Sequence, residues 1–149
     1  MKYSSLKWLV LASIINLVGN SLGIILAVKN NLIADLGGTL HGEDASRDFI
    51  STGTALSAPL QFMLIQLAFT VLTLSSGWLR KIGIAGLTFF GLIYTPAQLL
   101  ERIILRLLSP GGFDLAQFSV YVVNVITAIA MLVFGIWAWR TERKSAPVA

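Results

Sequence analysis

The sequence contains no cysteine and only one histidine, His41. Without cysteine the chain has no disulfide framework, no thiolate nucleophile and no Cys-based zinc or iron–sulfur site. We also find no G-x-S-x-G, no H-E-x-x-H and no phosphate-binding loop. The sequence therefore contains no recognisable motif for hydrolysis or nucleotide binding, and it predicts neither a metal site nor a cofactor.

Charged residues are also scarce, at 12% of the chain against 56% hydrophobic residues. This balance is far from that of a soluble domain of similar length and points to a lipid environment. The formal net charge is +4, but the basic residues stand at the ends of apolar runs rather than in a patch with aromatic residues. We therefore expect membrane lipids as partners and no nucleic acid.

The apolar residues form four runs, at about residues 7–28, 57–79, 82–108 and 117–139. Each is near the roughly 20 residues with which a helix crosses a ~30 Å hydrocarbon layer. The first run exceeds the ~7 to 15 residues of the apolar core of a signal peptide, so we interpret it as a true span. The sequence predicts a single all-α domain over residues 1–149, an integral membrane bundle of four transmembrane helices with a polar loop at about 29–56.

The distribution of Lys and Arg predicts the orientation, because basic residues near span ends resist translocation. Arg80-Lys81 would separate the second and third spans as antiparallel neighbours. Both termini would be cytoplasmic and the acidic 29–56 loop external, in a plasma membrane or bacterial inner membrane. Four basic residues would then lie outside. The seven inside would be Lys2, Lys7, Arg80, Lys81, Arg140, Arg143 and Lys144.

Glu101 and Arg102 are conspicuous in the third run, because ionised groups near hydrocarbon are costly. Counting ~1.5 Å per residue from Ile82 places Glu101 about 28 Å along the helix, near the outer edge of the layer. One interpretation is that Arg102 and Arg106 reach the outer headgroups while Glu101 offsets part of their charge. The other is that Glu101 accepts a proton or binds a cation, and that Arg102 or Arg106 holds an anionic group.

Polar residues recur at helical spacing and predict an inward polar stripe. The stripe would serve either as interhelical packing or as the lining of a small polar cavity. Its candidate ligand-contacting or partner-contacting residues are Asn16, Asn20, Gln66, Gln98 and Asn124.

Three further residues bear on helix packing. Gly19 and Gly23 form a G-x-x-x-G step that allows another helix to approach closely. Pro96 removes one backbone donor inside the third run, which predicts a bend there or a break that lines a cavity.

The length and the number of spans resemble those of small four-span drug exporters. In that family an essential carboxylate lies in the middle of the first span, whereas this span contains Asn16 and Asn20 and no acid. We therefore carry over no activity and assign no family.

Three functions remain open from the sequence. The leading hypothesis is a small, non-enzymatic accessory protein that acts by contact with lipid, with another membrane protein or with copies of itself. The second is a small transporter or ligand-binding bundle that uses the polar stripe. The third is a lipid-modifying enzyme with Glu101 as acid and base.

Overall fold

The structure, a computed structural model, describes residues 2–143, with side chains from residue 4 onward. The chain is mostly helical, as predicted. Its elements in order are α1 (Lys2–Asn30), β1 (Ala34–Leu36), β2 (Thr39–His41), α2 (Ala45–Asp48), α3 (Leu60–Leu74), α4 (Gly77–Leu100), α5 (Ile103–Leu107) and α6 (Leu115–Arg143). Lys144 lies outside the described residues.

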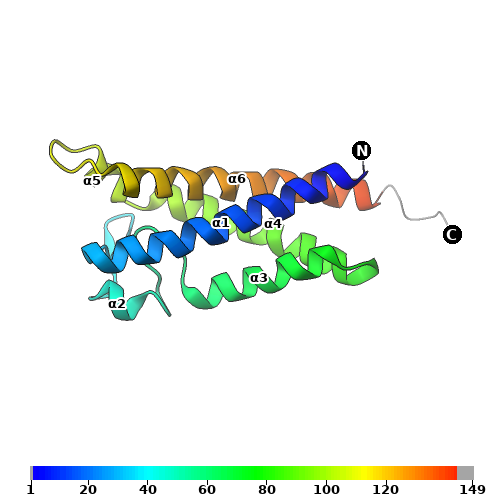
Figure 1. The fold of residues 1–149 in the computed structure, drawn as a ribbon, viewed down its shortest axis with the longest axis horizontal. Helices are drawn as coiled ribbons and strands as arrows, with labels where there is room; N and C mark the ends of the chain where they lie inside the picture. The colour runs from blue at the N-terminus through cyan, green and yellow to red at the C-terminus, as the bar shows by residue number, and fades with distance from the viewer. Residues whose placement is uncertain (1, 144–149) are drawn as a thin grey trace.

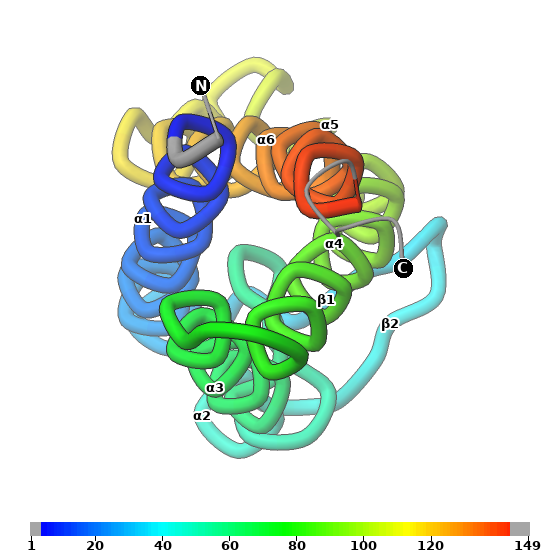
Figure 2. Tube along the Cα trace, turned by 90° about the vertical axis from the view of Figure 1, so that its right-hand side faces the viewer, coloured from blue at the N-terminus to red at the C-terminus, as the bar shows by residue number. Residues whose placement is uncertain are grey.

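Four helices run along the long axis of the molecule (Figure 1). Viewed from one end, α1, α3, α4 and α6 form a ring in which each helix packs against the next (Figure 2). The beginning of α1 and the end of α6 lie at one end, which we call the terminal end. The hairpin of β1 and β2, together with α2 and α5, lies at the opposite, capped end.

Three of these helices are long and apolar enough to cross a membrane: Ser4–Asn30, Gly77–Leu100 and Leu115–Arg143. Helix α3 is apolar but has only 15 residues, which corresponds to about 22 Å. The second predicted span, at 57–79, is therefore represented by a much shorter helix. Four crossings of a membrane stay a prediction.

The boundary between the second and third predicted spans lies earlier than expected. Helix α3 ends at Leu74, and α4 begins at Gly77, whose φ of 65° is a conformation that favours glycine. Arg80 and Lys81 therefore lie in the first turns of α4 rather than in the connection. The chain reverses at Ser75 and Ser76, where the Ser75 N–H donates to the Leu72 carbonyl at 3.1 Å, and Arg80 and Lys81 follow this turn.

The third predicted span, at 82–108, is divided. Helix α4 continues through Pro96 to Leu100 and stops there, because Glu101 has extended backbone angles of φ −68° and ψ 121°. Five more residues form α5. The hydroxyl of Thr95 donates to the Gly91 carbonyl at 2.7 Å, so a side chain supports the backbone near Pro96.

A turn at residues 54–58 lies buried between the helices of the capped end, and we call it the buried turn. Each of its residues is at most 9% exposed, and Leu56 is fully covered. Thr54 and Ser57 pair across it, with the Thr54 N–H donating to the Ser57 carbonyl at 3.0 Å. The buried turn takes the place of the helical turns that α3 lacks.

Candidate functional site

Asn16 and Gln66 connect three helices in the centre of the ring. The Asn16 amide donates to the Thr127 hydroxyl at 2.9 Å and to the Asn124 carbonyl at 3.3 Å, which joins α1 to α6. The Gln66 amide of α3 donates to the Ser13 hydroxyl at 3.0 Å and to the Asn16 side-chain oxygen at 3.3 Å. Asn16, Gln66 and Asn124 of the predicted stripe thus take part in interhelical hydrogen bonds, whereas Gln98 lies outside this network.

Asn20 and Asn124 hold the buried turn. The Asn20 side-chain oxygen accepts from the Ala58 N–H at 2.6 Å, and the Asn124 amide donates to the Leu56 carbonyl at 2.9 Å. Both asparagines are at most 1% exposed. A buried backbone donor or acceptor without a partner costs about 1–3 kcal/mol, so these two side chains stabilise a non-helical segment that the helices could not otherwise enclose.

Gly19 and Gly23 permit this arrangement. A Cβ at Gly19 would collide with the side chain of Asn124, and a Cβ at Gly23 would collide with the carbonyl of Leu56. The predicted close approach at this G-x-x-x-G step is therefore made within the chain, to α6 and to the buried turn. This face is covered and does not present a flat surface to a second copy.

The second cluster surrounds Glu101, at the end of α4. The Glu101 carboxylate accepts from the Asp35 N–H at 2.7 Å, and Leu36 forms an antiparallel bridge with Glu101. The Gly37 N–H donates to the Leu100 carbonyl and the Arg102 N–H to the Asp35 carbonyl, both at 3.0 Å. Backbone pairing with β1 therefore ends α4 and fixes the position of Glu101.

Glu101 is 5% exposed and forms no salt bridge with any described residue. Among the described residues the ion pair present is Arg80 with Glu142, at 3.4 Å and at the other end of the molecule. Arg102 and Arg106 thus form no ion pair with Glu101 within the described residues, although all three line one cavity. That Glu101 offsets part of their charge stays a prediction. Burial raises the pKa of this carboxyl, which lies outside the apolar helix Gly77–Leu100, from 4.5 to about 7.

Glu101 lines two cavities at the capped end. One, of about 240 Å³, lies between α4 and the buried turn and also contains Tyr94 and Gln98. The other, of about 260 Å³, lies on the hairpin side and contains Asp35, Arg102 and Arg106. The two arginines and Gln98 therefore line different cavities, and Glu101 lines both.

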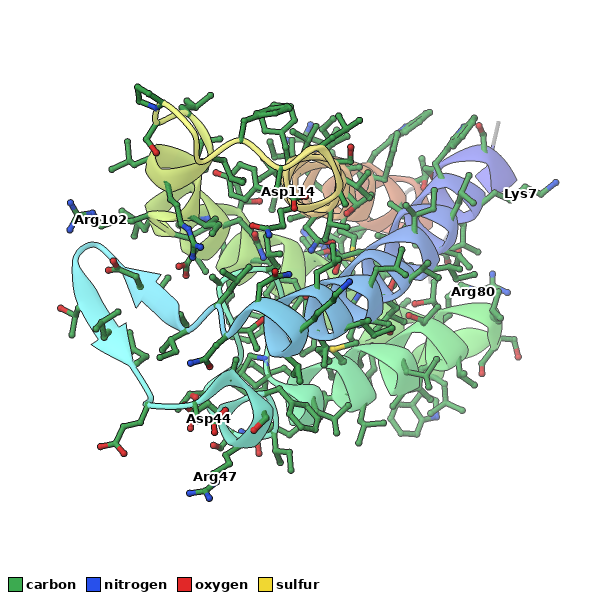
Figure 3. All side chains as sticks on the ribbon, turned by 60° about the vertical axis from the view of Figure 1, so that its left-hand side comes forward. Lys7, Asp44, Arg47, Arg80, Arg102 and Asp114 are labelled. Atoms are coloured by element: carbon green, nitrogen blue, oxygen red, sulfur yellow. The ribbon has the colours of Figure 1, made fainter. Side chains whose placement is uncertain are left out.

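Figure 3 shows how far apart the charged ends of the molecule are. Arg102 lies beside the hairpin, with Asp44 and Arg47 at the same end, whereas Lys7 and Arg80 lie at the terminal end. Hydrogen bonds from the Ser46 side chain and from the Ser46 N–H lower the pKa of the part-exposed Asp44 carboxyl, which caps α2.

Two features of the site had only weak sequence signals. Tyr94, one turn before Gln98 on α4, lines the smaller cavity, and Tyr121 of α6 donates to the Gln98 carbonyl at 3.1 Å. Tyr94, Gln98 and Glu101 are spaced by four and three residues, which places them on one helix face. This spacing could have indicated that Tyr94 belongs to the site. The buried turn has no signal beyond the small residues around Ser57.

Comparison with protein-family models, with curated proteins and with solved structures finds no match to this chain.

Proposed function

We propose that this chain is a multi-pass membrane protein with four crossings and cytoplasmic termini, in a plasma or bacterial inner membrane, and that it acts without catalysis. Its work is contact with lipid and with another membrane protein or a second copy. The observation that carries this proposal is the partition of its side chains. Asn16, Gln66 and their neighbours within the ring hydrogen-bond across the helices, while the outward faces of α1, α3, α4 and α6 are largely apolar.

The outer surface of α3 and α4 supports a contact function. A groove of about 480 Å³ runs between these helices and is lined by apolar residues, among them Phe62, Phe69 and Phe89. Small residues of α4 form its floor, including Gly86, where a Cβ would collide with the Phe69 ring. Such a groove accepts an acyl chain or a helix by dispersion contacts alone, which is how surfaces associate within lipid.

The depth of the buried turn supports four crossings. Helix α1 has 29 residues, about 43 Å, and exceeds a ~30 Å layer by about 13 Å. Asn20 lies ten residues before the end of α1, about 15 Å along the axis. Sharing the excess between both ends therefore places Ala58 about 8 Å inside the layer. Helix α3 supplies about 22 Å, so α3 and the buried turn together match the thickness.

The orientation is supported by the terminal end. Lys7, Arg80, Arg140 and Arg143 belong to the ends of α1, α4 and α6 that gather there. Trp8, Trp78 and Trp137 are exposed near the same ends, where the amphipathic rings of tryptophan favour an interface.

A direct test of topology uses the absence of cysteine. We introduce Ser46→Cys in α2 or Ser76→Cys in the α3–α4 turn and add an impermeant maleimide to intact cells. Labelling at residue 46 but not at residue 76 is expected. Labelling of both would show that α3 does not cross, and labelling of residue 76 alone would reverse the orientation.

The contact function is tested by native mass spectrometry of the protein extracted in discs of its own membrane. We expect a complex with a second protein or with a fixed number of copies or lipids. A bare monomer, recovered under conditions that preserve a known membrane dimer of similar size, would refute the proposal.

A further inference from the structure

We propose that the smaller cavity at Glu101 is a binding site for a small primary ammonium ion with an apolar body. This site goes beyond the contact function and does not depend on it. It lies where the buried turn meets the last turn of α4, which follows Pro96. Non-helical backbone enclosed between membrane helices is typical of ligand sites in multi-pass proteins.

The charge of the site favours a cation. Among the described residues, Glu101 is the one acidic or basic side chain that lines this cavity. It follows the C-terminus of α4, where the carbonyl groups of a helix concentrate negative potential. Arg102 and Arg106 lie in the neighbouring cavity rather than in this one, so they do not supply the positive charge here.

Two polar atoms of the site can accept hydrogen bonds and receive none from the described part of the chain. The Tyr94 hydroxyl and the Gln98 side-chain oxygen are buried and have no hydrogen-bond partner among the described residues. Tyr94 is 5% exposed, and both residues line the cavity with Glu101. An ammonium group carries three N–H donors, which matches one donor to each of Tyr94, Gln98 and Glu101.

The remaining wall determines the rest of the ligand. Leu36, Pro59, Phe62 and Ile93 line the cavity together with several alanines, and these side chains fit an alkyl or aromatic body. Three hydroxyl residues, Thr52, Thr54 and Ser57, also line it. The Thr54 and Ser57 hydroxyls bond to each other at 2.7 Å, and the Thr52 hydroxyl donates to the Asp48 carbonyl at 3.1 Å. The volume of about 240 Å³ is below the ~300–1,000 Å³ of sites for drug-sized molecules, so the ligand is small.

The test uses benzylammonium as the probe and the full chain in lipid discs, with empty discs as the blank. Isothermal titration calorimetry is expected to show saturable binding with one site per chain. Benzyl alcohol, which has the same ring but no charge, is expected to partition equally into discs that contain the protein and into empty discs. Equal heats from benzylammonium in loaded and empty discs would overturn the proposal.

Two variants assign the binding to this cavity. Glu101→Gln removes the charge and is expected to weaken binding at least tenfold, since hydrogen bonds to charged groups are the strongest of the set. Tyr94→Phe keeps the ring and removes the hydroxyl, with about a fivefold loss expected. Tyr94→Phe also serves as the decisive variant if Glu101→Gln does not fold.

Glu142→Gln is the matched control, because Glu142 lies at the terminal end in an ion pair with Arg80. It removes the same charge from the chain and is expected to leave benzylammonium binding unchanged. Binding that survives both Glu101→Gln and Tyr94→Phe, or that is lost equally in Glu142→Gln, would refute the assignment of the site.

Discussion

Substituting Gly23 by alanine tests the buried turn directly. The added Cβ would collide with the carbonyl oxygen of Leu56, and it would lie 2.9 Å from the Leu56 carbonyl carbon. Both atoms belong to backbone that is enclosed on all sides, so no flexible side chain can move away instead. We expect the turn to leave its place between α1 and α6.

The magnitude follows from the hydrogen bonds that this displacement breaks. The Leu56 carbonyl loses the Asn124 amide, and the Ala58 N–H loses Asn20. Each broken buried bond costs about 1–3 kcal/mol, while alanine returns up to ~1 kcal/mol through its better helix propensity. A net loss of about 2 kcal/mol makes the opened state of the turn roughly thirtyfold more populated.

Cysteine reactivity measures this population. Ala55 is 3% exposed in the buried turn, and Ala55→Cys would give the otherwise cysteine-free chain one protected thiol. Maleimide labelling of this thiol is expected to be about thirtyfold faster when Gly23→Ala is also present. Ser21→Ala, on the exposed side of α1, is the control and is expected to leave the rate unchanged. Equal rates with glycine and alanine at residue 23 would refute the reasoning.

Three further predictions concern stability in detergent. Because the pKa of Glu101 in the folded state, about 7, lies above its usual 4.5, its contribution is complete below about pH 4.5. This contribution of Glu101 to the free energy of unfolding, up to about 3 kcal/mol, is lost as the pH rises through 7. Glu101→Gln should flatten this part of a plot of unfolding midpoint against pH. An unchanged slope in the variant would contradict the prediction. Gly91→Ala places a Cβ 2.5 Å from the Leu132 backbone nitrogen and should lower the unfolding midpoint by several degrees more than Leu92→Ala on the adjacent exposed position. Glu142→Gln breaks the part-exposed pair with Arg80 and should change the free energy of unfolding by less than ~1 kcal/mol, so a larger loss in a denaturant titration would show that the pair is coupled to the core.

Composition was sufficient to predict the long helices, because a 20-residue apolar run has few alternatives to a helix in lipid. The predicted runs at 7–28 and 117–139 lie within α1 and α6. Hydropathy could not place the ends of α3 and α4, since Ser57, Ala58 and Leu79 are equally compatible with helix and turn. The boundaries depend instead on Gly77 and on the pairing of Glu101 with β1.

The inward position of Asn16, Asn20, Gln66 and Asn124 was predictable from spacing alone, since residues three and four apart share a helix face. Their partners were not. Asn20 and Asn124 bind backbone atoms of the buried turn, which lies 38 and 68 positions away in the sequence. Side-chain periodicity carries no information on which loop folds into a helical ring, and so the distinction between packing and cavity required the structure.

The dependence of the buried turn on Asn124 also has a consequence for biosynthesis. The Leu56 carbonyl receives its hydrogen bond from a residue made 68 positions later, when α6 is synthesised. Until then the Leu56 carbonyl lacks this donor. We therefore expect a chain stopped before Leu115 to expose a polar turn that the complete protein buries.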